Sequence, residues 1–245
     1  MILIKYLNDQ YQLKGLVSSN SFAIKGADMN FRFNKDVHIP VDKIVLEGEL
    51  VIPAEANAIV IFSHGSGSSR FSPRNRMVAA YLQRQHLGTL LFDLLTTSED
   101  RIYQNRFNIE LLTERLVSAT KWLQQYGPAK DCQLGYFGAS TGAASALKAA
   151  ARIPDISAVV SRGGRPDLAM DELHGVRSPV LLIVGSRDPD VLALNEKAYW
   201  EINAPKKITI IEGATHLFEE PGKMEQVCKE AGNWFDAYFQ TTLNN

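Results

Sequence analysis

The chain has 245 residues, of which 45% are hydrophobic and 22% charged, and its 26 Lys and Arg residues nearly balance its 27 Asp and Glu residues. This length suits one large α/β domain with a core of its own. The near-neutral charge gives no sign of a nucleic-acid or membrane partner, and no apolar run approaches the roughly 18 residues of a membrane span. The N-terminus lacks the basic flank and apolar stretch of a signal peptide, so we expect a cytoplasmic protein.

The N-terminal part of the chain is the hardest to interpret. Residues 1–36 have scattered apolar positions without a sustained period, which predicts an N-terminal extension of short strands or a loose arm. The main domain is expected to cover residues 37–245. Its first element is a strand at 41–52, which contains Gly48 and ends at Pro53, and we expect an antiparallel hairpin at the edge of the main sheet.

From residue 58 onward, predicted strands and helices alternate. Continuous apolar runs predict buried strands at 58–62, 88–93 and 132–137, and further strands are predicted at 156–160, 179–184 and 207–211. Helical spacing predicts helices at about 73–85, 109–126 with Asn108 as N-cap, 143–151, 191–201 and from about 221. This alternation implies a mostly parallel sheet with helices on both faces. Ligands of such sheets bind at the carboxyl ends of the strands, where the polar clusters of this chain lie.

One turn carries a recognisable motif. Gly138-x-Ser140-x-Gly142 stands between a predicted strand and a predicted helix, which is the context of a nucleophile elbow. The glycines relieve crowding around a sharp turn that would hold the Ser140 hydroxyl clear of the backbone. An ordinary serine in a glycine-rich turn is the alternative interpretation, because the bare motif occurs often by chance.

The residues that follow favour catalysis. A serine hydroxyl needs a base, and the base needs a carboxylate that fixes its tautomer. Asp188 and His216 follow the last two predicted strands, and the order Ser140, Asp188, His216 is that of α/β-hydrolases. Asp190 competes with Asp188, which lies nearer its strand. The oxyanion would be held by the N–H of Thr141 and by that of Ser66, with Gly65 as the second choice.

The sequence resembles the dienelactone hydrolase-like branch of the α/β-hydrolase fold. The resemblance covers about residue 40 to the C-terminus and is carried by the following segments: 63–70 (SHGSGSSR), 91–96 (LFDLLT), 138–142 (GASTG), Asp188 and 213–218 (GATHLF). Dienelactone hydrolases proper use a cysteine nucleophile, where this chain has Ser140. The resemblance implies a serine hydrolase that cleaves a small-molecule ester or lactone without a cofactor. His64 would shape the oxyanion loop. The segment 161–179 is too short for a large cap domain, so we expect an open, shallow site. The sequence is compatible with a homodimer and with a monomer.

Further residues at this edge suggest a substrate preference. Arg70, Arg162 and Arg165 lie on its loops and could bind an anionic part of the substrate, because arginine holds carboxylates through two hydrogen bonds. The alternative is that these arginines pair with nearby carboxylates such as Asp93 and Asp167. The two cysteines, Cys132 and Cys228, fall in a predicted strand and helix, and we interpret them as core thiols.

Functions other than ester or lactone hydrolysis are also compatible with parts of this sequence. A thioesterase, acyltransferase or peptidase would use the same three residues. A non-catalytic binding protein with this fold usually lacks one of them. A dinucleotide-binding domain is suggested by Gly65-x-Gly67 after a strand, but Arg70 stands in place of the third glycine and Asp93 comes too late.

Overall fold

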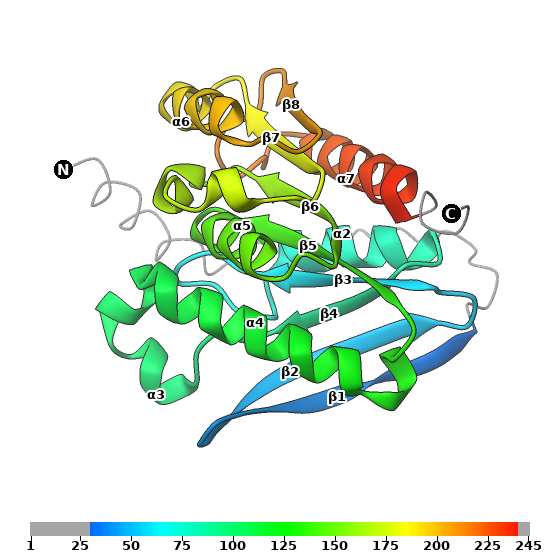
Figure 1. Ribbon diagram of the computed structural model, residues 1–245. Helices are drawn as coiled ribbons and strands as arrows, with labels where there is room; N and C mark the ends of the chain where they lie inside the picture. Colours follow the sequence, from blue (N-terminus) through cyan, green and yellow to red (C-terminus); the bar gives the residue numbers. More distant parts are fainter. Residues whose placement is uncertain (1–29, 240–245) are drawn as a thin grey trace.

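The computed structural model describes residues 30–239, which form one eight-stranded sheet with helices on both faces (Figure 1). The strands lie in the order β1-β2-β4-β3-β5-β6-β7-β8. β2 runs antiparallel to both β1 and β4, and every later pair is parallel. The predicted architecture is therefore confirmed.

The antiparallel hairpin at the sheet edge starts earlier than predicted. It consists of β1 (Phe31–Val41) and β2 (Ile44–Pro53). Residues 31–36, which we placed in the N-terminal extension, therefore belong to the sheet. Four of these six residues are exposed, and the alternation of apolar and polar residues from Phe31 to Asn34 is too short to reveal a strand. The rest of that extension, residues 1–29, lies outside the described residues.

The parallel part of the sheet follows the predicted alternation closely. Its strands are β3 (Ala58–Ser63), β4 (Gly88–Phe92), β5 (Gln133–Ala139), β6 (Ile156–Arg162), β7 (Val180–Gly185) and β8 (Lys206–Ile211). The main helices are α2 (Pro73–Arg84), α4 (Ile109–Gln125), α5 (Thr141–Arg152), α6 (Pro189–Glu201) and α7 (Lys223–Phe239). As predicted, the Asn108 side chain caps α4, where it accepts from the N–H of Leu111 at 3.1 Å.

Two groups of helices cover the two faces of the sheet. Helices α4, α5 and α6 lie on the face nearer the viewer in Figure 1, and α2 and α7 lie behind it. Each face has its own apolar core, with Leu116 and Leu147 in the first and Phe62 and Phe137 in the second. Strands β3 and β7 are buried along their whole length, which explains their continuous apolar sequences.

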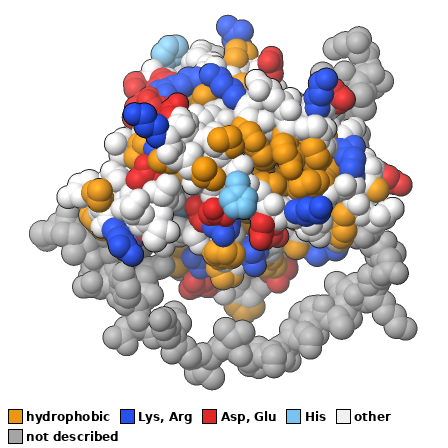
Figure 2. All heavy atoms as spheres, turned by 90° about the horizontal axis from the view of Figure 1, so that it is seen from below, with side chains coloured by type: hydrophobic (Ala, Val, Ile, Leu, Met, Phe, Trp, Pro, Cys, Tyr) orange, Lys and Arg blue, Asp and Glu red, His pale blue; other side chains and the backbone are white. Residues whose placement is uncertain are grey.

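The β1 edge of the molecule also has an apolar surface. Figure 2, which views the molecule from below, shows hydrophobic side chains gathered in one area and bordered by charged ones. Where α4 packs on β1, Tyr126 contacts the rings of Phe33 and Trp122, with centroid distances of 5.7 and 4.6 Å. These aromatic contacts fix the hairpin against the first helix layer.

Short helices occupy the connections that the sequence presented as loops. The polar loop predicted at 96–107 contains α3 (Thr97–Asp100) and η2 (Tyr103–Phe107). A capping box between Thr96 and Glu99 starts α3. Between β6 and β7 there are only the 3₁₀ turns η4 (Pro166–Ala169) and η5 (Leu173–Gly175), so the described chain has no large cap. Within residues 30–239, no helix combines the length and apolar character of a membrane span.

Candidate active site

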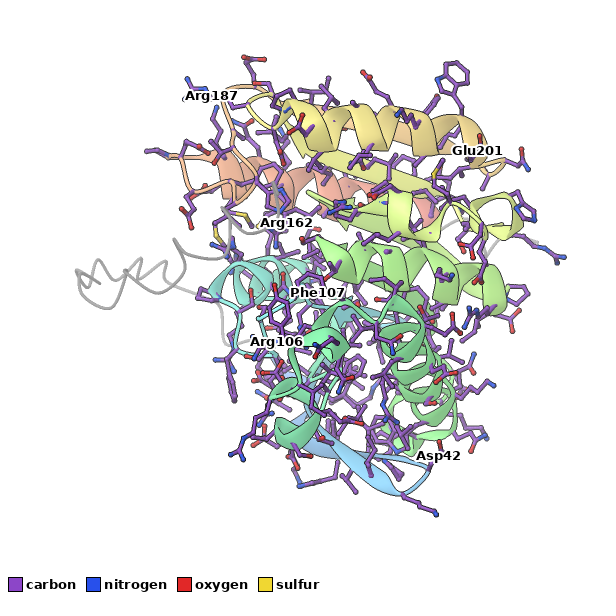
Figure 3. All side chains as sticks on the ribbon, turned by 90° about the vertical axis from the view of Figure 1, so that its left-hand side faces the viewer. Asp42, Arg106, Phe107, Arg162, Arg187 and Glu201 are labelled. Carbon is purple, nitrogen blue, oxygen red and sulfur yellow. The ribbon has the colours of Figure 1, made fainter. Side chains whose placement is uncertain are left out.

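The structure brings the predicted triad residues to one edge of the sheet. Ser140 lies in the turn between β5 and α5, Asp188 between β7 and α6, and His216 in the loop after β8. These are the carboxyl ends of parallel strands, which point the same way. Figure 3 faces this edge of the molecule.

Ser140 occupies a strained turn. Its backbone angles, φ 52° and ψ −122°, place a non-glycine residue where side chains are seldom found. A Cβ added at Gly138 would lie 2.5 Å from Cα of Ala143, and one added at Gly142 would lie 2.2 Å from the carbonyl oxygen of Ser63. Both spacings are too short for any side chain. The crowding argued from the sequence is therefore present in the structure.

His216 and Asp188 form a direct hydrogen bond. Nδ1 of His216 lies 2.6 Å from Oδ2 of Asp188. Because a carboxylate accepts and does not donate, Nδ1 carries the proton and Nε2 is left with a lone pair. The Asp188 side chain is buried, whereas Asp190, its rival in the sequence, is exposed in the first turn of α6. The acid that orients the imidazole in this structure is Asp188.

The loop after β6 joins Ser140 to His216. The Ser140 N–H donates to the carbonyl of Arg162 at 3.2 Å, and the Arg165 N–H donates to the carbonyl of Ser140 at 3.1 Å. Between these two arginines, a Cβ added at Gly163 would lie 3.5 Å from Cε1 of His216. The nucleophile candidate and the base candidate therefore both contact the segment 162–165.

The loop after β3 packs directly on Ser140. A Cβ added at Gly65 would lie 3.1 Å from Cβ of Ser140. The N–H of Ser66, one of the two expected oxyanion donors, donates to the hydroxyl of Thr141 at 2.8 Å. The other expected donor is the backbone N–H of Thr141 itself, in the first turn of α5. Thr141 thus carries one expected donor and binds the other through its hydroxyl, which the sequence did not suggest.

His64 links the loops after β3 and β4 through hydrogen bonds of its ring. Its Nε2 accepts from the N–H of Leu94 at 3.1 Å, so the proton must be on Nδ1, which lies 3.0 Å from the carbonyl of Gly65. Burial lowers the pKa of His64 below its usual value, although the Gly65 carbonyl and the charge of Asp93 oppose this shift. His64 is therefore a neutral link between the loops after β3 and β4, as its sequence context indicated.

The three arginines expected at a substrate anion have different partners. Arg70 forms an ion pair with Asp93, which also accepts from the Arg70 backbone N–H at 2.7 Å. Arg165 donates through Nε and Nη2 to the two oxygens of Asp167, at 2.8 and 2.7 Å. Arg162 is 5% exposed and forms no ion pair with any residue from 30 to 239. Arg70 and Arg165 therefore pair with carboxylates of the protein, which was the alternative interpretation of the sequence. Arg162 differs from both.

An open groove lies beside this site. It has a volume of about 760 Å³ and runs between β2 and the loops after β3 and β4. Its lining includes the exposed Phe71, whose ring lies 4.4 Å from the guanidinium carbon of Arg70 and 5.0 Å from that of Arg76. None of the three triad residues lines it. The groove lies next to the loop after β3, and the sequence analysis did not predict it.

Comparison with known proteins assigns this chain to a family. A sequence model of the dienelactone hydrolase family matches residues 82–241, which is more than half of the chain. The chain belongs to the dienelactone hydrolase family. The resemblance inferred from the motifs is thereby confirmed, and this family member has the hydrolase fold that its strand order indicates.

Solved structures agree with the family assignment. A dienelactone hydrolase from Anabaena variabilis is 50% identical to this family member, with a TM-score of 0.82 over 84% of this chain and 98% of that one. Est1E from Butyrivibrio proteoclasticus is 15% identical, with a TM-score of 0.72 over 83% and 98% of the two chains. An esterase from Pyrococcus furiosus is 20% identical, with a TM-score of 0.69 over 84% and 93%. The last two similarities show a shared fold.

Curated relatives of this family member are longer than it is. Two proteins from strains of Mycobacterium tuberculosis, both named "Putative phosphoribosyl transferase", are 51% identical to it over 204 residues. The match covers 82% of this chain and 46% of each relative. The chain therefore spans about half the length of the curated relatives it matches.

Proposed function

We propose that this protein is a serine hydrolase that cleaves carboxylic esters or lactones of small molecules through an acyl-enzyme on Ser140. The observation that carries the proposal is the 2.6 Å hydrogen bond between His216 and Asp188, on the same sheet edge as a serine in a strained strand-to-helix turn. Membership of the dienelactone hydrolase family supports a hydrolase. The triad, the ester or lactone substrate, a cytoplasmic location and a reaction without a cofactor are our proposals.

In the first half of the reaction, Nε2 of His216 accepts the Ser140 hydroxyl proton while Oγ attacks the carbonyl carbon of the ester. The carbonyl π electrons move to oxygen and form a tetrahedral oxyanion. When this intermediate collapses, the C–O bond to the alcohol breaks and His216 returns the proton to the leaving oxygen. Asp188 stabilises the imidazolium that exists between the two proton transfers. In a lactone, the released alcohol stays attached to the acyl group.

In the second half, a water molecule replaces the alcohol. His216 takes a proton from the water as its oxygen attacks the acyl carbon, and a second oxyanion forms. Collapse breaks the bond to Ser140 Oγ, which regains the proton from His216. The products are the carboxylic acid and free enzyme, so the cycle consumes one water for each ester bond.

The oxyanion hole needs one rearrangement in this proposal. The Thr141 N–H lies at the start of α5, where the helix dipole also favours negative charge. The Ser66 N–H becomes available when the Thr141 hydroxyl turns away from it, or the hydroxyl donates its own proton to the oxyanion while it accepts from Ser66. The N–H of Gly65 is the remaining choice in that loop.

Several other activities use the same residues or the same fold. A thioesterase, an acyltransferase and a peptidase differ from an esterase in the leaving group or the acceptor, and substrate profiling separates them. Phosphoribosyl transfer, named for the Mycobacterium tuberculosis proteins, is not proposed here, because the chain spans 46% of their length and presents a hydrolase-like site. A binding protein without catalysis would show no turnover.

Active-site labelling tests the proposal. A fluorophosphonate probe should attach to Ser140, as read by mass spectrometry of the digested protein. Ser140→Ala should lower kcat on 4-nitrophenyl esters about 10⁴-fold or more, because the covalent intermediate can no longer form. Ser157→Ala is the matched control, since this half-buried serine lies at the amino end of β6, opposite the edge that carries the proposed triad. Label on another residue, or full activity of Ser140→Ala, would contradict the assignment.

A further inference from the structure

The buried guanidinium of Arg162, a residue whose backbone contacts Ser140, has no hydrogen-bond acceptor among the described residues. The Arg162 side chain offers five N–H donors, yet no hydrogen bond or ion pair holds it within residues 30–239. Its Nε is completely buried without a partner. The guanidinium carbon lies 5.9 Å from the ring centroid of Phe218. A buried charge without a partner strongly destabilises a fold, so an arginine present only for packing would be unfavourable here.

A second cation increases this positive charge. Arg74 lies close enough that its charge, after the larger effect of burial, helps to lower the pKa of Arg162 to about 9. Arg162 therefore remains protonated at neutral pH. Arg74 donates to Glu219 at 2.9 Å, but its Nε is also buried without a partner. The carboxylate of Glu219 is exposed to solvent, so it pairs with Arg74 at the surface.

The N-terminal end of helix α2 adds further positive potential. Arg74 belongs to the first turn of this 12-residue helix, which contains no acidic residue. The helix N-terminus carries a partial positive charge that favours anions. Asn75, in the same turn, is 2% exposed, and its side-chain oxygen has no partner within residues 30–239. Rotation of this amide by half a turn presents an N–H donor at the same place.

The location connects these groups to the reaction. The carbonyl of Arg162 accepts the Ser140 N–H, and the next residue, Gly163, lies against the His216 ring. In Figure 3, Arg162 lies near the middle of the edge that carries the proposed triad. A group bound by this arginine would therefore belong to the molecule whose ester bond faces Ser140.

We infer that Arg162, supported by Arg74 and the N-terminal turn of α2, binds an anionic oxygen group of the substrate, a carboxylate or a phosphate. The inference deepens the proposed function and rests on it, because it assigns the substrate class of the same site. It also separates Arg162 from Arg70 and Arg165, whose charges are already matched by carboxylates. An arginine can hold either group through two parallel hydrogen bonds, which gives direction as well as affinity.

Kinetics with matched substrates test the inference. The probes are 4-nitrophenyl esters of butyric, succinic and phosphoglycolic acid, which carry no charge, a carboxylate and a phosphate beyond the ester. Arg162→Gln should raise KM for whichever anionic ester the enzyme prefers by about 10- to 100-fold, the effect of losing charge-assisted hydrogen bonds. It should leave KM for the butyrate within about twofold. Arg162→Lys should fall between the two, because lysine keeps the charge but loses the planar fork. Arg177→Gln, at the amino end of β7, is the control.

Binding without turnover separates this inference from the proposed function. Succinate and inorganic phosphate should each be titrated calorimetrically into the full-length Ser140→Ala protein, with and without Arg162→Gln. We expect one of the two anions to bind and the second substitution to abolish that binding. No binding of either anion, or equal losses on charged and neutral esters, would overturn the inference. If Arg162→Gln does not fold, Arg162→Lys and the preference of the unmodified enzyme decide, and a preference for the butyrate ester overturns it. Failure of Ser140 labelling would leave the titration valid.

Discussion

Two buried cations on opposite faces of the sheet have opposite surroundings. Lys148 on α5 is 8% exposed, and its Nζ lies 2.9 Å from Glu172 and 3.1 Å from Asp171. Burial alone would lower the pKa of Lys148, but these carboxylates raise it above its usual value. Arg162, at 5% exposure, has no carboxylate partner in the described part of the chain. The charge of Lys148 is thus paired with carboxylates of the protein itself, whereas the charge of Arg162 would be paired only by a bound anion.

This difference separates residues that hold the structure from residues that serve the reaction. Around Lys148, charges are paired within the protein, as Arg152 also shows through its bonds to Glu110 and Glu172. At the carboxyl edge, an unpaired charge and a strained serine lie together. Substitutions in the first region should change stability and leave rates alone, and substitutions in the second should do the reverse.

The largest expected effect is at Asp188. Asp188→Asn should lower kcat about 10⁴-fold, because an amide favours the wrong tautomer of His216. Its melting temperature should stay close to that of the unmodified protein. Asp190→Asn is the matched control and should be nearly silent, since Asp190 is exposed. Steady-state kinetics and thermal melting measure both. A larger rate loss for Asp190→Asn would move the acid to that residue.

An intermediate effect is expected at Lys148. Lys148→Met should reduce the free energy of unfolding by about 1–3 kcal/mol, because Glu172 and Asp171 lose a hydrogen-bond donor. Its kcat/KM on the preferred ester should not change. Lys197→Met, on the exposed face of α6, serves as the control. Urea unfolding followed by circular dichroism gives the energies. If Lys148→Met instead lost activity at full stability, the proposed division between the two regions would be wrong.

The smallest effect concerns the pH dependence of stability through His64. Its pKa is lowered in the folded protein, so its contribution is fully present above about pH 6.5 and is lost as the pH falls towards the folded value. Protonation of Nε2 would break its bond to the N–H of Leu94. The loss is at most about 1.4 kcal/mol per pH unit.

Urea unfolding between pH 7.5 and 5.5 measures this dependence. His64→Gln can still accept a hydrogen bond but does not titrate, so its stability should fall less over this range than that of the unmodified protein. Parallel curves for the two proteins would show that His64 makes no contribution.

Much of this structure follows from periodicity and motif alone. The buried strands and the helices between them appear near their predicted positions, because a strand covered on both faces must be apolar throughout. Gly138 and Gly142 were predicted from crowding, and the close approaches of Ala143 and Ser63 show that crowding. The placement of Asp188 beside His216 also followed from strand order, since both must lie at the carboxyl edge.

The features that the sequence did not reveal depend on contacts between distant segments. The bond from Ser66 to the Thr141 hydroxyl joins residues 75 positions apart, and nothing local indicates it. The local sequence also does not show that Arg162 lacks a partner among the described residues, because this depends on where every carboxylate of the fold lies. Arg74 was overlooked, although Ser72-Pro73 after the oxyanion loop signals a helix start that would place it at this edge.

The backbone of Ser140 also bears on how this protein could change over time. A serine at φ 52° holds its turn at a conformational penalty of about 1–3 kcal/mol that a glycine would largely avoid. A chain that lost the need for its hydroxyl could therefore become both inactive and harder to unfold through a single substitution. At position 140, stability and activity therefore favour different residues. Stability alone would favour glycine, and only the need for the hydroxyl maintains the serine.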